Sequence, residues 1–188
     1  MIKRLPFALA AFLLIGQLHA ATPTGWFVAG TARESYDVGT QAGDRRPGDR
    51  NAFIRAKPES SGFGTLMQTI RADTYIGKRL RLSGFMRTKD AISAAMWMRI
   101  DGSNKEVVGF DNMSSRPLRG NTEWRRYEIV LDIPDNAKAI AFGFLLEGNK
   151  GEVLADDFKL DVVSKDVPLT GTANPLLPAT PVNMDFAR

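Results

Sequence analysis

The sequence predicts an all-β protein with an antiparallel sandwich or barrel. From Gly25 to about Val163, short apolar or alternating runs recur between Gly, Asn, Asp and Pro, and no long segment has a helical period. Many short strands at this spacing are typical of sandwiches and barrels. The chain has 188 residues, a length that suits one domain with a sizeable core.

The expected strands follow one another along this region, each bounded by turn residues. A single helical turn is expected at 72–77, between the third and fourth strands. In chain order, the expected strands cover 26–29, 52–57, 64–70, 79–88, 94–100, 107–111, 124–133, 139–146 and 153–162.

The N-terminal stretch 1–20 has the layout of a secretory signal peptide. Lys3 and Arg4 precede an apolar run, and the stretch ends at the small residue Ala20. The run is too short to span a bilayer. Cleavage after Ala20 would leave a mature domain beginning at Ala21, in the bacterial periplasm or the medium. The absence of cysteine fits a bacterial export route better than a eukaryotic one.

The only histidine, His19, lies within this cleavable stretch, and the chain has no cysteine. The mature chain would therefore lack Ser-His-Asp and Cys-His catalysis, thiol chemistry, disulfides and the common zinc sites. The net charge of +4 would fall to +2, because Lys3 and Arg4 are lost and no acidic residue goes with them. A nearly balanced surface argues against nucleic acid as a partner. The run DRRPGDR at 44–50 is interpreted as a solvated loop.

Past Val163 the composition changes. Residues 164–181 contain four prolines among Thr, Gly, Ala and Asn, which predicts an extended linker because proline cannot donate to a sheet. Residues 182–188 contain a short alternating run typical of a strand. This tail either frays, as termini commonly do, or returns to complete a sheet.

Alternation within the strands divides their side chains between two faces. In 94–101 the even positions are apolar, whereas Trp97, Arg99 and Asp101 share the other face. In 79–88, Phe85 and Arg87 likewise oppose the apolar positions. In the strand at 139–146, one face offers the small residues Ala141 and Gly143, which leave room above the sheet.

This mixture of aromatic rings, arginines and small residues predicts a carbohydrate site. An aromatic ring covers the apolar face of a sugar while Arg, Asp, Asn and Gln form directed hydrogen bonds. The alternative is that the charged residues form cross-strand salt bridges and that a loop covers Trp97. The predicted ligand-binding residues are Trp97, Arg99, Asp101, Arg87, Phe85, Gln68, Asp111 and Asn112.

Three motifs resemble the galactose-binding-like jelly rolls of bacterial carbohydrate-binding modules. They are GKRLRLSG at 77–84, NTEWRRY at 121–127 and GEVLADDF at 151–158, and the resemblance covers about 25–163. The run FDNM at 110–113, followed by Arg116, Pro117 and Gly120, is also similar to an uncharacterised bacterial domain found alone or beside secreted peptidases and regulators. The resemblance implies a jelly-roll sandwich.

The resemblance has two further implications. In some modules the late acidic motif ligates a structural calcium ion, which leaves Asp156 and Asp157 open as calcium ligands beside the alternative of a solvated acidic pair. No other cofactor is expected. Domains of this kind often begin with a strand resembling Asn-Leu-Asp-Phe-Glu, whose closest match here is NMDF at 183–186. That match favours a tail that completes the sheet within the same chain.

The expected function is binding rather than catalysis. An exported, non-catalytic module for a carbohydrate or glycan-like ligand is preferred. One alternative is an envelope adaptor that docks a protein partner. Another is a glycosidase that uses carboxylates alone, for which Asp101, Asp111, Glu123 and Glu147 are available.

Overall fold

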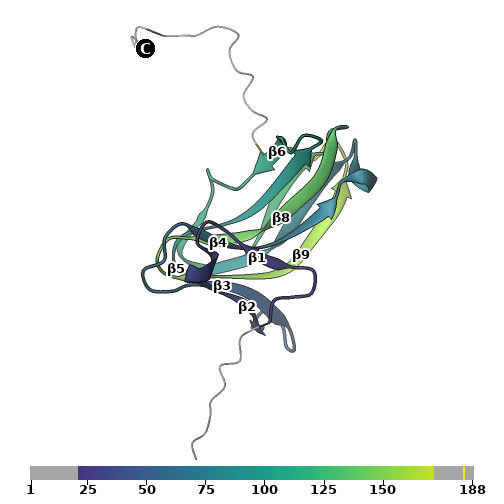
Figure 1. The fold of residues 1–188 in the computed structure, drawn as a ribbon. Coiled ribbons are helices and arrows are strands. Elements are labelled where there is room, and N and C mark those ends of the chain that lie inside the picture. Colours follow the sequence, from purple (N-terminus) through teal and green to yellow (C-terminus); the bar gives the residue numbers. More distant parts are fainter. Residues whose placement is uncertain (1–20, 172–183, 185–188) are drawn as a thin grey trace, which may run out of the picture.

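The computed structural model describes residues 21–171 and Met184, which include nine antiparallel strands (Figure 1). Two short 3-10 helices, η1 (Arg33–Ser35) and η2 (Asp73–Tyr75), connect neighbouring strands. The strands are β1 (Phe27–Ala29), β2 (Tyr36–Ala42), β3 (Arg50–Ala56), β4 (Phe63–Arg71), β5 (Arg79–Gly102), β6 (Val107–Asp111), β7 (Leu118–Asp132), β8 (Ala137–Glu147) and β9 (Glu152–Val163).

The long strand β5 belongs to two sheets. Its first half, residues 79–89, pairs with β7 on one side and β9 on the other. Its second half, residues 93–102, pairs with β8 and β6. Between the halves, the register with β7 shifts repeatedly and Asp90 has a positive φ of 51°, features that bend a strand. Hydrogen bonds join all nine strands into one network that is continuous through β5. We call the part with the order β2-β3-β9-β5-β7 sheet I and the part with the order β1-β4-β8-β5-β6 sheet II.

The core lies between the two sheets. Leu80, Leu82 and Met86 from the first half of β5 are fully buried, as are Met96 and Met98 from the second half. Burying each such side chain contributes about 1.5–3 kcal/mol. Across the core, the ring of Phe144 on β8 lies 5.8 Å from that of Phe158 on β9, edge to face. These contacts hold the two sheets face to face.

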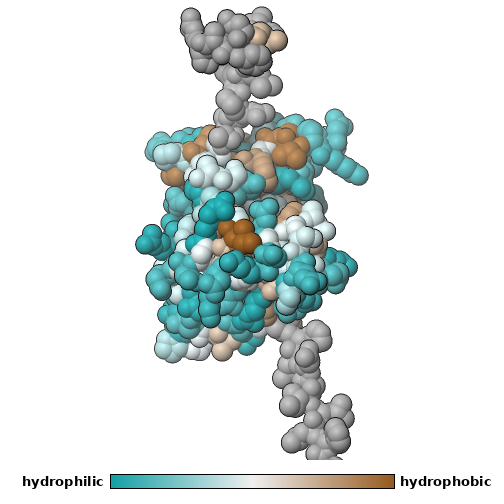
Figure 2. All heavy atoms as spheres, turned by 90° about the vertical axis from the view of Figure 1, so that its left-hand side faces the viewer, coloured by the Kyte–Doolittle hydropathy of each residue, from teal (hydrophilic) through white to brown (hydrophobic). Residues whose placement is uncertain are grey.

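Few large apolar side chains remain on the surface. Those that do are scattered over several elements, and the side seen in Figure 2 is largely hydrophilic with separate hydrophobic spots. Single exposed apolar residues are normal in globular proteins. Within residues 21–171, no helix is both long and apolar enough to cross a lipid bilayer.

Three details of the expected strands are corrected. Strand β2 was not expected, because Gly39 and Thr40 interrupt its apolar pattern; it pairs with β3 alone and lies at the edge of sheet I. The separate strands expected at 79–88 and 94–100 form the single strand β5. The helical turn expected at 72–77 contains only the three-residue helix η2.

The start of the predicted linker contacts the domain. The Thr170 amide donates to the Val130 carbonyl at 3.1 Å, and the Val130 amide donates to Thr170 Oγ1 at 2.7 Å. Thr170 therefore binds the edge of β7 that does not pair with β5. The predicted signal peptide at 1–20, the remainder of the linker, and the strand-like tail apart from Met184 lie outside the described residues.

Candidate functional site

Trp97 lies on the face that its alternation predicts, but it is buried, with 8% of its surface exposed. Its ring packs with Met67 and Ala141 in a small cluster separate from the main core. Its indole Nε1 donates to Thr65 Oγ1 at 2.9 Å. The side chain thus fills the room that Ala141 and Gly143 leave above sheet II. Its ring is not available to stack on a sugar.

The other predicted residues on sheet II form local pairs. Arg99 Nε lies 2.8 Å from Asp101 Oδ1, and both line a hollow of about 460 Å³ with Lys105 and Lys138. Gln68 is in register with Phe142 and has the parity of the core residue Leu66. Gln68 therefore belongs to the opposite side of the sheet from Trp97.

Asp111 and Asn112 shape the turn between β6 and β7. Asp111 is buried and accepts hydrogen bonds from Arg116 Nη2 at 2.7 Å and from the Met113 amide at 2.8 Å. Burial opposes ionisation of Asp111, but these hydrogen bonds outweigh it and hold its pKa below the usual range. The side chain of Asn112 accepts from the Ser114 amide at 3.1 Å. Both side chains have a structural partner.

Phe85 and Arg87 lie on the outer face of sheet I, away from the Trp97 face, because β5 crosses from one sheet to the other between residues 89 and 93. The eight predicted residues therefore do not form one cluster. The structure keeps together Trp97, Arg99 and Asp101 on sheet II, and Phe85 with Arg87 on sheet I.

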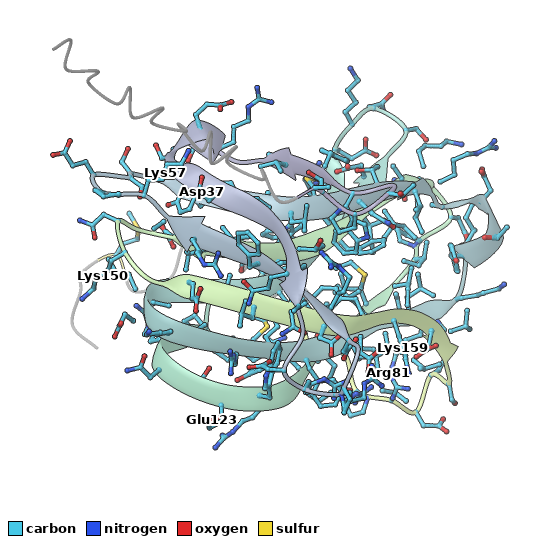
Figure 3. All side chains as sticks on the ribbon, turned by 90° about the horizontal axis from the view of Figure 1, so that it is seen from below. Asp37, Lys57, Arg81, Glu123, Lys150 and Lys159 are labelled. Atoms are coloured by element: carbon cyan, nitrogen blue, oxygen red, sulfur yellow. The ribbon has the colours of Figure 1, made fainter. Side chains whose placement is uncertain are left out.

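Figure 3 looks toward the outer face of sheet I. On this face, three aromatic rings each lie close to an arginine. Arg55 lies 4.1 Å from the ring centroid of Phe53, and Arg45 lies 3.8 Å from that of Phe85. Further along, Arg87 lies 5.3 Å from the ring of Trp124. Cation–π contacts of this kind stabilise arginines over aromatic faces while their polar edges stay accessible.

The loop between β2 and β3, residues 43–49, lies across this face. Asp44 Oδ1 accepts from Trp124 Nε1 and from Asn51 Nδ2, both at 3.1 Å, and Asp44 Oδ2 pairs with Arg87 at 2.7 Å. Burial opposes ionisation of Asp44, yet these partners lower its pKa overall. Through Asp44, the loop contacts β3, β5 and β7 on the outer face of the sheet.

The predicted calcium ligands hold this loop instead. Asp156 accepts from Arg45 Nε at 2.6 Å, and Asp157 pairs with Arg45 and, at 2.9 Å, with Arg46. The arginines supply the positive charge that a cation would have brought. Among residues 21–171, no group of three acidic or histidine side chains is arranged to hold a metal ion.

Beside the loop, sheet I has a hollow of about 360 Å³ between β5, β7 and β9. The buried side chain of Leu154 lies in its lining, and Arg87, Glu152, Lys89 and Glu123 contribute charged groups. Glu123 is labelled in Figure 3. Glu152 is oriented by Arg55 Nε at 2.7 Å. The hollow thus brings together charged donors and acceptors.

The prediction from the sequence missed Trp124, Asp44 and Glu152 at this site. A signal for Trp124 was present, because its parity opposes the core residues Ile129 and Leu131 along β7. No signal pointed to Asp44, since the run 44–50 is indistinguishable from an ordinary solvated loop. Its contact with Trp124 joins residues 80 positions apart.

The four carboxylates considered for a glycosidase do not meet. Glu123 lines the hollow of sheet I and Asp101 lines that of sheet II, while Asp111 is engaged by Arg116. Glu147 is exposed at the end of β8. A pair of catalytic carboxyl groups must face one another within about 5–10 Å. This arrangement does not favour glycoside hydrolysis.

Comparison with known proteins identifies a relative of the chain. No family model matches. The chain is 38% identical over 166 residues to a protein of Bacillus subtilis (strain 168) named as the uncharacterized HTH-type transcriptional regulator YbfP, a match that covers 86% of this chain. The match spans 56% of the length of that relative.

Solved structures resemble the fold. The CBM22-1 xylan-binding domain of Paenibacillus barcinonensis Xyn10C superposes with a TM-score of 0.54 and 13% identity, over 78% of this chain and 90% of that one. A CBM4 structure superposes with a TM-score of 0.53 and 15% identity, over 77% of this chain and 91% of that one. The enzymatically active domain of tailspike protein 4 of bacteriophage CBA120 superposes with a TM-score of 0.58 and 16% identity, over 74% of this chain and 20% of that one. The predicted jelly-roll fold of carbohydrate-binding modules is therefore confirmed.

Proposed function

We propose that this domain binds a carbohydrate, or a similar polyhydroxylated ligand, without catalysis, in the hollow on the outer face of sheet I. The observation that carries the proposal is that cationic and carboxylate side chains line one hollow together: Arg87, Lys89, Glu123 and Glu152. The fold, which resembles non-catalytic xylan-binding and related modules, supports the same class of ligand.

The chemistry of the hollow suits hydroxyl groups. Each sugar hydroxyl both donates and accepts, so a site needs cationic donors and carboxylate acceptors close together. Arg87 and Lys89 supply donors, while Glu123 and Glu152 supply acceptors. Trp124 follows Glu123 in the chain, and its partly exposed ring lies 5.3 Å from Arg87, which places an aromatic surface beside the hollow for the C–H groups of a sugar.

The proposed site retains the ligand class predicted from sequence and two of the predicted residues, Arg87 and Phe85. Arg87 lines the hollow, and Phe85 supports the loop through Arg45. Trp124 takes the role that the sequence assigned to Trp97.

Isothermal titration calorimetry with glycans selected from an array tests the proposal. Arg87→Ala and Glu152→Gln should each weaken binding at least tenfold. Arg99→Ala removes the same kind of charge from sheet II and should leave the affinity within twofold of wild type. If Arg99→Ala abolished binding and Arg87→Ala did not, the site would lie on sheet II instead.

A second candidate function is ligand sensing within a transcriptional regulator, which the similarity to the Bacillus subtilis protein favours. Between residues 21 and 171, the only helices are the three-residue helices η1 and η2, so this part contains no helix-turn-helix. In such a regulator, the shared region would bind the effector rather than DNA. The expected results are glycan binding by this chain and no shift of DNA in a mobility assay.

The cellular location of the protein distinguishes an exported binding module from a part of a transcriptional regulator. We propose export, with cleavage after Ala20, on the basis of the N-terminal pattern. Fractionation of a Gram-negative host expressing the chain should recover the protein outside the cytoplasm. Its measured mass should be that of a chain beginning at Ala21. Full-length protein confined to the cytoplasm would favour the regulator setting.

A further inference from the structure

A second hollow, of about 390 Å³, opens between the two sheets and is separate from the proposed carbohydrate site. Its lining includes Ala52 of β3 and Ala155 of β9 from sheet I, and Leu66 of β4 and Phe144 of β8 from sheet II. Trp26 and Phe158 complete the apolar lining. No residue of the outer-face hollow takes part.

The hollow exists because small residues meet on the inner side of sheet I. Ala52 and Ala155 are cross-strand partners, and they have the parity of the buried residues Ile54 and Val153. Leu66 and Phe144 are cross-strand partners in sheet II. Two methyl groups do not reach as far as two larger side chains would, so space remains between the sheets.

Aromatic rings are held rigidly around this space. Trp26 and Phe158 lie 6.0 Å apart, and Phe158 and Phe144 lie 5.8 Å apart, all edge to face. Phe158 packs on Gly84, where an added Cβ would lie 2.2 Å from its ring. Because the rings are fixed by these contacts, the hollow is preformed, and little ordering of side chains opposes binding.

The acidic groups at the opening are paired, whereas the cationic Arg50 is not. Asp156 and Asp157 are paired with Arg45 and Arg46. Arg50 also lines the hollow and donates to the neutral Thr40 Oγ1 at 2.8 Å, but among the described residues it has no carboxylate partner. A cationic ligand would find no free counter-charge here and would lose its hydration. The opening therefore disfavours a positively charged molecule.

We propose that this pocket, which we call the inter-sheet pocket, binds a small apolar or aromatic molecule that carries no positive charge. Its volume lies in the range of small-molecule sites, about 300–1,000 Å³, and it has their usual mostly apolar lining with a few polar groups. The ligand class differs from that proposed for sheet I, so the two proposed sites can be tested independently of each other.

A fluorescence titration of the full chain with N-phenyl-1-naphthylamine, a neutral apolar dye, tests the proposal. Saturable binding of one dye per chain is expected. The dye 1-naphthylmethylamine shares the naphthalene ring but is cationic at pH 7, and it should bind at least tenfold more weakly. The neutral dye should also raise the melting temperature, by an amount that grows with the logarithm of the dye concentration once this exceeds the dissociation constant.

Filling the pocket provides the matched variants. Ala52→Leu should weaken dye binding at least tenfold without lowering the melting temperature, because the new side chain enters space that is already present. Ala56→Leu, on the same strand and with the same parity, lies outside the pocket lining and should leave dye affinity unchanged. If Ala52→Leu does not fold, Ala155→Val introduces a smaller filling group for the same measurement.

Three results would overturn the proposal. They are no saturable binding of the neutral dye, equal binding of the two dyes, or dye affinity that Ala52→Leu and Ala155→Val both leave unchanged. Loss of glycan binding in Arg87→Ala with dye binding retained would separate the two sites and support both.

Discussion

The outer faces of the two sheets carry similar residues but use them differently. On sheet II, Trp97 lies over small residues, donates to Thr65 and is almost completely buried. On sheet I, Trp124 stays partly exposed, and its indole holds Asp44 of the loop 43–49. An aromatic side chain on an outward strand position thus becomes part of a satellite core where its neighbours are small. It stays partly exposed where its neighbours are arginines and carboxylates.

The largest expected effect is on Trp97. Trp97→Ala removes a buried ring and leaves Thr65 without its indole donor, so the free energy of unfolding should fall by about 3–5 kcal/mol. Urea denaturation followed by circular dichroism measures this change. Trp124→Ala serves as the counterpart and should cost about 1 kcal/mol or less, while it lowers glycan affinity. Equal losses of stability in the two variants would contradict the comparison.

Substitution of Gly143 tests whether the small residues of sheet II are needed to accommodate the Trp97 ring. A Cβ at this position would lie 2.2 Å from the Leu66 carbonyl oxygen, so Gly143→Ala should cost about 1–3 kcal/mol through backbone displacement. Trp97 fluorescence should change at the same time. Gly77→Ala, whose Cβ would meet nothing within 4 Å, should cost only about 1–2 kcal/mol for its positive φ and leave Trp97 fluorescence unchanged.

Asp44 tests whether the loop on sheet I is held by the contacts described. Asp44→Ala removes the partner of Trp124, Asn51 and Arg87 and should destabilise the domain by about 1 kcal/mol, the usual range for exposed ion pairs. Trypsin should then cleave after Arg45 or Arg46 faster than in wild type. Unchanged cleavage would show that Arg45 alone holds the loop.

The smallest effect concerns pH at the end of sheet I. Hydrogen bonds from Arg79 and Lys165 lower the pKa of Asp132 from 3.8 to about 2. A carboxyl whose pKa is lowered in the folded state stabilises the protein above pH 4, and this contribution is lost as the pH falls toward 2. Solvent screening limits it to about 1 kcal/mol or less. Thermal melts from pH 5 to pH 2 should show a shallower decline for Asp132→Asn than for wild type.

Much of the fold could be predicted from local pattern. The alternation in β5, β7 and β8 correctly identifies which side chains face the core, because successive side chains of a strand point to opposite sides. Strand β2 escaped prediction because Gly39 interrupts its pattern, and an edge strand needs fewer apolar side chains. That β5 is one continuous strand was not predicted, because residues 89–93 contain charged and small residues that are equally compatible with a turn.

The candidate site was less predictable than the fold. Parity placed Phe85, Arg87, Trp97 and Arg99 on outward faces, but parity within a strand does not say which sheet that part of the strand joins. The bend at Asp90 separates the two pairs. The pairing of Asp156 and Asp157 with Arg45 and Arg46 likewise depends on how a distant loop folds back.

By itself, the sequence determined the fold class, the inward faces of most strands and the scarcity of groups for histidine or cysteine chemistry, because these follow from composition and local periodicity. Only the tertiary structure decided that Trp97 is sealed, that Trp124 meets Asp44, and that Ala52 and Ala155 leave a pocket between the sheets. Each of these depends on which side chains from remote segments fill the space around a residue. Local pattern carries no information on that.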